Sequence, residues 1–488
     1  MLRSWSLNLT ITSTSGIAVY LQIAQQIINE IQRGRLAPST AMPGTRDLSE
    51  KLKVNRKTVV LAYDELIAQG WLTTQNRRGT FVSADLPNFT ASESANKVGS
   101  KLVSSLEETI ESQTLYQTTP SNTIDFNDGI PDTRLIPCEV LSRAFRHILL
   151  GPERSNKLGY GDPRGATGLR QAIATMLNME RGLNVDEEKI CVTRGSQMGI
   201  FLAARVLTKH DDYVVVEDLS YPPAREAFRS CGAKILTVDQ DKYGVDVVAL
   251  EKLCKKYPIK AIYVTPHHQF PTTVIMTAER RLKLLILAKQ YDFTIVEDDY
   301  DHEFHFSHRP VFPLASTNHA DKVVYVGSLS KVLAPGLRVG YLVASKSFIG
   351  KCAQDVMLID RQGNSITELA VAELMISGEI KRHIRRTFKA YHERRNLLIN
   401  LISSQLGDFV NFDVPSGGLA FWLRLNNGLN INDLEKSALK KNVRILPGTL
   451  FSASAKEVNA IRLGFGSLNI NELELGVSKL RDAFCEKT

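Results

Sequence analysis

Apolar side chains recur every three or four residues over 17–33, which predicts a helix that ends at Gly34. Two shorter helical segments follow, one after Thr45 and one that begins at Val54–Asn55 and ends at Gly70. Two β-prone runs, WLTT and TFV, then flank a polar, basic turn that contains a glycine. Three helices followed by a hairpin predict a winged helix-turn-helix domain of the α+β type.

The pattern changes between residues 84 and 122. Twelve of these 39 residues are Ser or Thr, none is Arg, and no strong strand is present. We therefore expect a head at 1–83, a linker at 84–122 and a second domain at 123–488. Within the linker, apolar residues fall on one helical face over roughly 98–115, which predicts a short amphipathic helix.

From residue 123 onward the pattern indicates an α/β domain. Short apolar runs such as YVVVE, AIYVTP and KVVYVGS alternate with helical stretches, and each run ends in a polar loop. The last part, roughly 355–488, is helical with a small β portion, which predicts a compact α+β lobe. Ligand sites in open parallel sheets form where the carboxyl ends of the strands converge, so these loops are the place to look for function.

Composition excludes several classes of protein. Apolar residues make up 43% of the chain and charged residues 23%, which is ordinary for a globular protein and excludes a mostly disordered one. No stretch approaches the roughly 20 apolar residues of a membrane span, and the first residues lack the apolar core of a secretory signal. The six cysteines are scattered without a CxxC pair, so we expect reduced thiols in the cytoplasm and no metal site.

The basic charge is concentrated in the head. Residues 1–83 hold ten Lys and Arg against five Asp and Glu, a net +5, whereas the rest of the chain carries +3. A small basic domain suggests an anionic partner, with nucleic acid as the first candidate. Charge alone is equally compatible with a solvated basic surface.

The segment GSLSKVLAPGLRVGY, residues 327–341, holds the most informative chemistry. Lys331 follows an apolar strand, Ser328 and Ser330 precede it, and Arg338 comes seven residues later. An amine with hydroxyls and a guanidinium suits an aldehyde cofactor that carries a phosphate, because the amine can form a Schiff base while the other groups bind the phosphate. Taken by itself, the segment is also compatible with a surface lysine after a strand.

Other strand ends add complementary groups. Asp298, at the end of FTIVEDDY, could pair with a protonated pyridine nitrogen, and Tyr300 could hydrogen-bond the ring's O3′. The segment TRGSQMG at 193–199 opens a helix with small residues, so its backbone N–H groups can cradle a phosphate. Tyr221 follows YVVVEDLS and could stack on the ring. Each residue alone could be a cap, a turn or part of the core, and their joint order along the strand ends favours the cofactor site.

These motifs resemble known families. Residues 123–488 resemble the fold-type I, class I/II aminotransferases, which bind pyridoxal 5′-phosphate. Residues 17–83 resemble the GntR winged-helix domain, through LxPSTAMPGTRDLSEKLKVNRKTVVLAYDELIAQGWL and the closing RRGTFV. In this order the two parts resemble the MocR/GabR family of bacterial transcription regulators. Further motifs similar to that family are FNDGIPD, YGDPRGATGLRQAIA, TPHHQFPT, VEDDYDHEF and IRLGFGS.

The resemblance implies a role for individual residues. Lys331 would form the internal aldimine, Asp298 would pair with the pyridine nitrogen and Tyr300 with O3′. Arg462 would take a substrate or effector carboxylate, for which a bidentate guanidinium is the physical match. The phosphate would be surrounded by Ser196, Gln197, Ser328, Ser330 and Arg338. Tyr160 would reach a phosphate in the partner subunit, because these folds form homodimers with shared sites.

The chain departs from the aminotransferase pattern at three points. It reads TPHHQFPTT where NPxNPTG is usual, so His268 takes the position of the asparagine that contacts O3′. Thr273 replaces the usual glycine, which predicts a locally reshaped loop. Leu219 stands where proline is common in EDLSYPPAR, and Arg225 in that run is expected to face the ligand, with the effector's carboxylate as its partner.

The head contains candidates for DNA contact. Asn55, Arg56, Lys57 and Thr58 are expected to be exposed in the first turn of the recognition helix, where Arg and Asn can read base edges in the major groove. Arg46 suits a phosphate or base contact. Arg77 and Arg78 in the wing suit the minor groove or phosphates. The residues expected mostly in the core are Val54, Val59, Leu61, Ala62, Tyr63 and Leu66.

These observations lead to a PLP-dependent transcription regulator that binds double-stranded operator DNA and senses a small amino compound. A working aminotransferase with a DNA-binding head is the alternative, and a sensor of pyridoxal phosphate itself is a third hypothesis. The basic segment 381–395 is either a solvated helix or a source of additional DNA phosphate contacts.

Overall fold

The computed structural model describes residues 9–12, 17–75, 78–86, 122–151, 158–306, 311–317, 320–329, 331–426 and 428–486. The chain divides into two compact units, Met1–Ser112 and Gln113–Thr488, which are treated separately below as the head and the body. The amphipathic helix expected at 98–115 lies outside the described residues. In the parts that are described, no helix is long and apolar enough to cross a membrane.

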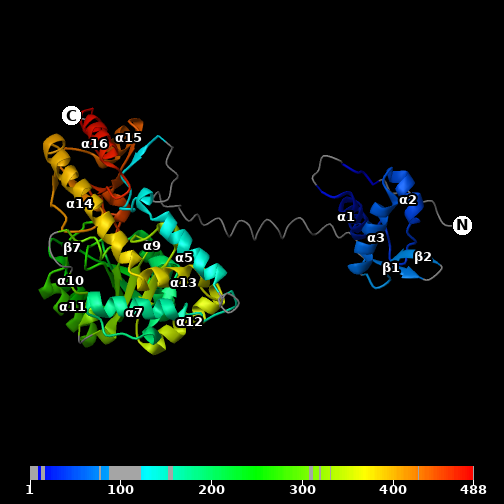
Figure 1. Ribbon diagram of the computed structural model, residues 1–488, viewed down its shortest axis with the longest axis horizontal. Coiled ribbons are helices and arrows are strands. Elements are labelled where there is room, and N and C mark those ends of the chain that lie inside the picture. The colour runs from blue at the N-terminus through cyan, green and yellow to red at the C-terminus, as the bar shows by residue number, and fades with distance from the viewer. Residues whose placement is uncertain are drawn as a thin grey trace. The chain divides into compact units, whose positions relative to one another are not determined.

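The head has the predicted winged-helix fold. Its elements are α1 (Val19–Gln32), α2 (Thr45–Leu52), α3 (Arg56–Ala68), β1 (Leu72–Gln75) and β2 (Gly79–Val82), as Figure 1 shows. The two strands pair antiparallel, with Leu72 opposite Val82. Gly34 follows α1 with φ 71°, a left-handed conformation that suits glycine and ends the helix as predicted.

One face of α3 forms the core of the head. Val59, Ala62, Tyr63 and Leu66 are buried at helical spacing against α1 and α2, as predicted. The sequence predicts Leu61 in this core, but the residue is 54% exposed because it lies between the inward-facing positions of the helix. The prediction for Leu61 is therefore wrong.

The body is built on a seven-stranded sheet in the order β4-β12-β11-β10-β9-β5-β6. All neighbouring strands are parallel except β12, which runs antiparallel to both β11 and β4. The strands are β4 (Ile190–Thr193), β5 (Tyr213–Glu217), β6 (Lys234–Val238), β9 (Ile259–Val264), β10 (Thr294–Asp299), β11 (Val323–Ser328) and β12 (Gly340–Val343). A small hairpin pairs β7 (Gln240–Asp241) with β8 (Gly244–Val245).

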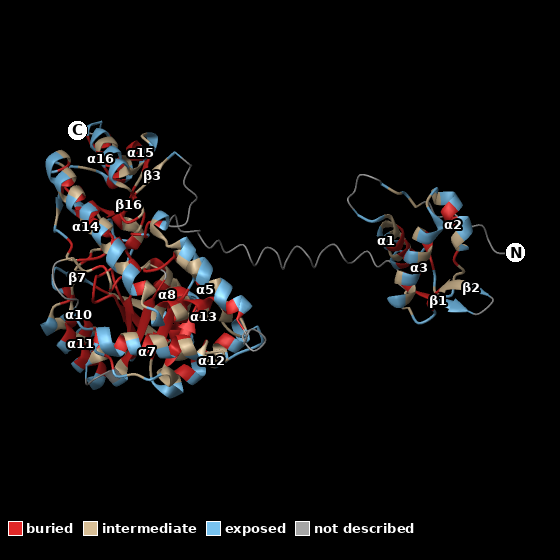
Figure 2. Ribbon diagram, in the orientation of Figure 1, coloured by how far each residue is buried: buried red, intermediate tan, exposed pale blue. Residues whose placement is uncertain are grey.

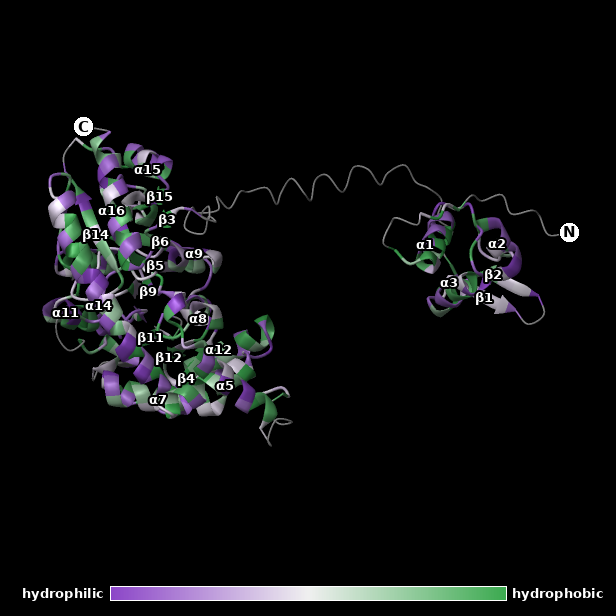
Figure 3. Ribbon diagram, turned by 45° about the horizontal axis from the view of Figure 1, so that its top comes forward, coloured by the Kyte–Doolittle hydropathy of each residue, from purple (hydrophilic) through white to green (hydrophobic). Residues whose placement is uncertain are grey.

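Helices cover both faces of this sheet, and the strands are almost wholly buried (Figure 2). The helices of this layer are α5 (Cys138–Leu150), α7 (Thr167–Arg181), α8 (Gly195–Leu207), α9 (Pro222–Ser230), α10 (Val247–Lys256), α11 (Ala278–Gln290), α12 (Lys346–Ile359) and α13 (Ser365–Ile376). Short 3₁₀ turns lie at Thr133–Leu135, Glu187–Lys189, Leu314–Ser316, Ala320–Lys322, Pro335–Leu337 and Gly448–Phe451. Many helices show hydrophobic and hydrophilic stripes in Figure 3, as helices that cover a sheet require.

A second lobe contains a four-stranded antiparallel sheet in the order β13-β14-β17-β16. Its elements are β13 (Val410–Phe412), β14 (Ala420–Leu425), β15 (Val443–Arg444), β16 (Leu446–Pro447), β17 (Ala460–Gly464), α14 (Glu379–Gln405), α15 (Ile431–Lys440) and α16 (Ile470–Cys485). Strand β3 (Ile124–Asp125) pairs in parallel with β15, so the start of the body completes this lobe.

The predicted lobe at 355–488 therefore needs two corrections. The end of α12 and all of α13 pack in the cores that cover the large sheet, through residues such as Val356 and Val371. In the other direction, Phe126 from the start of the body is buried in the core of the lobe. These contacts join segments that are far apart along the chain, which a local pattern does not reveal.

The basic segment 381–395 lies in α14 and is only partly solvated. Arg394 is buried and its Nη2 lies 2.7 Å from the Asp132 carboxylate. Arg395 is also buried and donates to the Pro415 carbonyl at 2.7 and 2.9 Å. The last part of the segment thus has a structural role, while Arg385, Arg386 and Lys389 are exposed.

A close backbone approach fixes the sheet edge beside the start of α8. Gly340 in β12 pairs with Thr193 in β4, and a Cβ at Gly340 would lie 2.5 Å from the Gly195 carbonyl carbon. The same Cβ would lie 2.8 Å from Ser196 N, so no side-chain rotation could relieve the clash. Only glycine fits here without a backbone shift.

We predict that Gly340→Ala destabilises the body by about 1–3 kcal/mol, because the added methyl group overpacks two backbones. Chemical denaturation of the full chain, followed by circular dichroism, measures this change. Gly336→Ala is the matched control, since a Cβ there meets nothing within 4 Å. Equal stability of Gly340→Ala and the wild type would show that the close approach is not a constraint.

Candidate functional site

Lys331 lies directly after β11 and above the Tyr300 ring. Its Nζ is 4.5 Å from the ring centroid. Burial lowers the pKa of Lys331, although the nearby Asp128 and Asp301 act in the opposite direction. A lowered pKa increases the neutral fraction of the amine, which is the nucleophilic form that a carbonyl group requires.

Asp298 has the surroundings expected of a partner for a ring nitrogen. Its carboxylate is buried, and Oδ2 accepts a hydrogen bond from the Tyr263 hydroxyl at 2.8 Å. Oδ1 has no hydrogen-bond partner among the described residues. Burial raises the pKa of Asp298 to about 7. A cation at Oδ1 would offset this cost of burial, so the carboxylate fits a protonated pyridine nitrogen.

Tyr300 and His268 are in contact, though not through the imidazole. The Tyr300 hydroxyl donates to the His268 backbone carbonyl at 3.1 Å. The His268 ring is fully buried, and its Nδ1 lies 2.8 Å from the Asp301 carboxylate. The structure thus places His268 next to Tyr300, while its side chain is oriented by Asp301.

The segments predicted to bind phosphate meet at the β4–β12 edge. Helix α8 begins at Gly195, so the backbone N–H groups of Ser196 and Gln197 lie in its first turn, where anions bind favourably. Gln197 donates to the Pro223 carbonyl at 3.0 Å, and its buried Oε1 has no partner among the described residues. Ser328 ends β11 opposite Gly340 and is buried.

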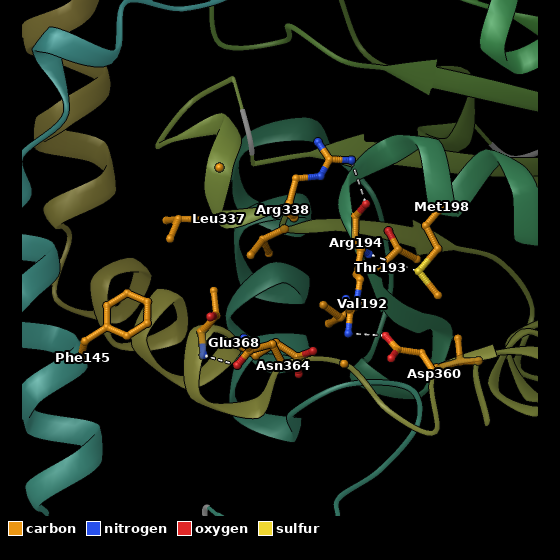
Figure 4. Close-up of a pocket in the computed structure, with 15 residues that line it drawn as sticks. Phe145, Val192, Thr193, Arg194, Met198, Leu337, Arg338, Asp360, Asn364 and Glu368 are labelled. Carbon is orange, nitrogen blue, oxygen red and sulfur yellow. Dashed lines mark hydrogen bonds and ion pairs between the residues drawn. The ribbon is translucent and has the colours of Figure 1, made fainter. Parts of the chain in front are cut away.

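Arg338 reaches the start of α8. Its Nη2 donates to the Arg194 carbonyl at 3.0 Å, a contact drawn as a dashed line in Figure 4. A Cβ at Gly195 would lie 2.6 Å from this nitrogen, so the end of the Arg338 side chain would have to shift if Gly195 were replaced. Arg338 also lines a pocket of about 360 Å³ together with Thr193, Met198 and Glu368. Ser330 lies outside the described residues.

Arg462 is 1% exposed and lies over the Phe270 ring, with 4.5 Å between the guanidinium carbon and the ring centroid. Its nitrogens donate to the backbone carbonyls of Asp128 and Pro271 at 2.5–3.2 Å. None of these partners is a carboxylate, so the positive charge has no ion-pair partner in these bonds. An anionic group of a ligand is a suitable partner.

Tyr221 and Arg225, two other predicted ligand contacts, lie at the N-terminal end of α9. Arg225 is buried and donates to the Phe451 carbonyl at 3.2 Å, but its Nε has no hydrogen-bond partner among the described residues. Burial lowers the pKa of Arg225. The Tyr221 ring packs edge-on against Phe270, with 5.3 Å between ring centroids.

The sequence interpretation missed several residues of the site. Tyr263 was part of an apolar run, but the β9–β10 register sets it beside Val296, two residues before Asp298. Phe270 and Asp301 were seen only as parts of motifs. A buried aromatic residue with a hydroxyl in a central strand was the one local signal for Tyr263.

The loop TPHHQFPTT contains a left-handed residue at the unusual position. Thr273 has φ 64°, a conformation that glycine would adopt without a Cβ penalty. Its backbone N–H donates to the Gln269 carbonyl at 2.6 Å, which closes the turn. Thr273 thus occupies a position that favours glycine, at a cost in backbone strain.

Tyr160 lies on the surface of the body. The residue is 81% exposed, and the Arg361 guanidinium lies 4.6 Å from the ring centroid. The side chain is therefore accessible to another protein chain.

The head exposes most of the predicted DNA contacts. Arg46, Arg56 and Lys57 are exposed, and Arg56 Nε donates to the Thr45 hydroxyl at 3.3 Å, which connects α3 with α2. Arg78 is exposed, Thr58 is partly buried, and Arg77 lies outside the described residues. Asn55 is the N-cap of α3 and accepts from Lys57 N at 2.9 Å, a structural role that the sequence interpretation missed.

Comparisons with known proteins agree with this geometry. Residues 121–480 match the family described as aminotransferase class I and II, and residues 19–82 match bacterial regulatory proteins of the gntR family. The chain belongs to the aminotransferase class I and II family and carries a GntR-type helix-turn-helix head.

Curated relatives share the whole architecture. The probable rhizopine catabolism regulatory protein MocR of Rhizobium meliloti is 29% identical over 98% of this chain and 96% of its own length. The pyridoxine biosynthesis transcriptional regulator PdxR of Corynebacterium glutamicum is 28% identical over 95% of both chains. The chain thus has the organisation of MocR-type transcription regulators.

The body also resembles solved aminotransferases. The α-aminoadipate aminotransferase LysN of Thermus thermophilus, complexed with N-(5′-phosphopyridoxyl)-L-leucine, aligns with a TM-score of 0.70 and 29% identity. The alignment covers 75% of this chain and 93% of LysN. The predicted fold is confirmed, and pyridoxal 5′-phosphate is the cofactor that this fold and the residues around Lys331 fit.

The raised pKa of Asp298 predicts how stability depends on pH in the cofactor-free chain. Between the ordinary carboxyl pKa of about 4 and the folded value of about 7, the folded state holds a proton that the unfolded state has lost. Stability from this group is therefore lost as pH rises from about 4 to about 7, by up to about 1.4 kcal/mol per pH unit.

Urea unfolding of the cofactor-free wild type and of Asp298→Asn, across that pH range, measures the effect. The variant cannot ionise at this position, so its free energy of unfolding should fall less steeply with pH. Parallel pH profiles for the two proteins would contradict the assignment of the raised pKa to Asp298.

Proposed function

We propose that the chain is a transcription regulator whose head binds operator DNA and whose body, with pyridoxal 5′-phosphate, senses a small amino compound. The observation that carries the proposal is the presence, in one chain, of a winged helix with exposed Arg46, Arg56 and Lys57 and of a cofactor site around Lys331. Such a protein acts on DNA in the cytoplasm.

The residues of the site have separate roles in this proposal. Bound pyridoxal phosphate supplies an aldehyde that reacts reversibly with primary amines. The amine of Lys331 would hold the cofactor, and the effector's amine would replace it and release the lysine. Asp298 holds a proton at the ring nitrogen, and Tyr300 orients the ring from the O3′ side. The residues assigned to the phosphate are Ser196, Gln197, Ser328, Ser330 and Arg338.

Other residues select the effector. Arg462 offers charge-assisted donors for a carboxylate or a similar anion, since its present partners are neutral carbonyls. Arg225 offers a second buried guanidinium, whose Nε has no hydrogen-bond partner among the described residues and lies 4.0 Å from the Glu226 carboxylate. Tyr221 would stack on the ring of the cofactor, and His268 lies beside Tyr300. An effector that carries both an amine and an anionic group fits this arrangement.

The proposal includes a homodimer. Tyr160 is exposed in the single chain, in the motif that resembles the family segment reaching a partner's phosphate. A dimer would present two heads to two half-sites of an operator, as two-fold symmetric regulators do. The exposed residues Arg385, Arg386 and Lys389 of α14 are further candidates for phosphate contacts.

A working aminotransferase is the second candidate. The residues that an aminotransferase needs around its cofactor ring and substrate carboxylate are present: Lys331, Asp298, Tyr300 and Arg462. Replacement of the Lys331 amine by the substrate's amine is also the first step that transamination requires. Repeated turnover with a keto acid would favour the enzyme. A change in operator affinity with pyridoxal phosphate alone would instead favour a sensor of the cofactor.

We predict that Arg56→Ala weakens specific DNA binding by about 1–3 kcal/mol, because it removes a base or phosphate contact of the recognition helix. Fluorescence anisotropy with the DNA upstream of the gene for this protein, at several salt concentrations, measures the loss of affinity. Cofactor binding should be unchanged, since Arg56 is in the head.

Three further variants separate DNA contacts from structural effects. Arg33→Ala removes an exposed charge outside α2, α3 and the wing, and should leave affinity at the wild-type value. Asn55→Ser keeps an oxygen that can cap α3, whereas Asn55→Ala loses the cap at about 1 kcal/mol. If Arg56→Ala binds DNA as tightly as Arg33→Ala, the recognition helix is not the DNA contact.

We predict that Lys331→Ala still binds operator DNA but responds abnormally to the effector. The variant lacks the amine that the effector displaces, while Asp298, Tyr300 and Arg338 remain to hold the cofactor. An effector shifts the equilibrium between two conformations of the protein only if it binds one of them more tightly than the other. In this proposal the difference in affinity begins when the effector's amine replaces the amine of Lys331.

The measurement is operator affinity, with and without candidate amino compounds, for the wild type and the variant at equal salt. Lys322→Ala is the control, because this lysine pairs with Asp292 on the surface and should preserve the response. A normal response in Lys331→Ala would mean that exchange at this amine is not the signal.

A further inference from the structure

Four histidines gather where β9 and β10 end. We call His267, His268, His302 and His305 the histidine cluster. The ring centroids of His267 and His268 are 4.5 Å apart, and those of His267 and His302 are 4.6 Å apart. His305 lies 5.6 Å from His268. The cysteine pattern predicted no metal site, and these histidines were not part of that argument.

His267 is the most unusual member of the cluster. Its side chain is buried, with 3% of the residue exposed, and neither ring nitrogen has a hydrogen-bond partner among the described residues. A buried polar group without a partner costs about 1–3 kcal/mol. The environment therefore requires an additional partner for this ring.

Asp299, the last residue of β10, provides a carboxylate next to His267 and His302. Its Oδ2 accepts from the Tyr325 hydroxyl at 2.6 Å and lies 2.9 Å from His302 Nδ1. Arg181 is 3.4 Å from the same oxygen. Oδ1 has no partner among the described residues, and the carboxylate is buried. One oxygen is thus anchored and the other is available.

We propose that His267, Asp299 and His302 bind a divalent transition-metal ion of the zinc type. One nitrogen or oxygen from each residue lies within 4.8 Å of the others, so small side-chain rotations would bring all three to one ion. Two imidazoles and a carboxylate suit zinc, which accepts these ligands without a strict geometric preference. This site is independent of the proposed function.

The neighbours of Asp299 support this assignment. Tyr325 and Arg181 hold Oδ2 and so orient Oδ1, as residues around metal ligands usually do. An ion here would connect the loop after β9 with the end of β10. That connection would brace the strand end that presents Asp298 and Tyr300 on the cofactor side.

A second trio, His267, His268 and His305, has the same atomic proximity. His268 is committed to Asp301 at 2.8 Å and lies next to Tyr300, so this trio overlaps the cofactor site. The proposal therefore uses Asp299 and His302. Replacement of His302 and of His305 distinguishes the two trios.

The test uses the full chain with pyridoxal phosphate bound and without a polyhistidine tag. The protein is stripped with a chelator, dialysed against Zn²⁺, and analysed for bound metal. We expect one Zn²⁺ per chain and a higher melting temperature with the metal, because binding to the folded state stabilises it. Co²⁺ in place of Zn²⁺ should give visible absorption bands typical of nitrogen and oxygen ligands.

His302→Gln should weaken Zn²⁺ binding at least about tenfold, since it removes one ligand. His210→Gln is the matched control, because this side chain is 86% exposed and belongs to neither trio, and it should keep wild-type affinity. Asp299→Asn tests the carboxylate, and His302→Gln remains decisive if that variant does not fold. The proposal is overturned if the wild type binds no Zn²⁺, if His210→Gln loses as much affinity as His302→Gln, or if His305→Gln abolishes binding while His302→Gln retains it.

Discussion

Parallel pairing of β10 with β11 is the constraint on which the site depends. The register places Asp298 opposite Val326 and Asp299 opposite Gly327, so the carboxyl ends of the two strands lie side by side. Asp298, Tyr300 and Lys331 are brought together where these strands end, although Asp298 and Lys331 are 33 positions apart in the chain. The antiparallel β12 then brings Gly340 and Arg338 to the start of α8, where the sequence predicts the phosphate of the cofactor.

The alternation of side chains along β10 divides the strand end into two environments. Asp298 lies with Tyr263 and near Lys331, whereas Asp299 lies with Tyr325 and Arg181. Successive residues of a strand point to opposite faces, so adjacent carboxylates can serve different partners. This is the physical reason why a cofactor site and the proposed metal site can lie one residue apart.

The head and the body differ in where they place their charged residues. The head buries one face of each helix and leaves Arg46, Arg56 and Lys57 exposed, as a GntR-type head that binds an anionic partner such as DNA requires. The body buries its charges, among them Asp298, Arg225 and Arg462, and these are stable only with internal partners or a ligand. A regulator that binds both DNA and a cofactor needs both arrangements.

Much of this protein was predictable from the sequence by itself. Helical spacing, the turn chemistry of the wing and the alternation of strands and helices determined both domains, because these signals are local. The motif around Lys331 determined the cofactor class, since its residues are close in the chain. Asn55 shows the limit of this argument, because a cap and a base contact have the same local signature.

Only the tertiary structure decided which residues share an environment. It placed Tyr263 on Asp298, Phe270 under Arg462 and His267 beside Asp299, and it joined β3 to the distant lobe. It also exposed Leu61 and buried Arg394. These outcomes depend on strand register and on packing between segments far apart in the chain, and neither is encoded in the periodicity of a single segment.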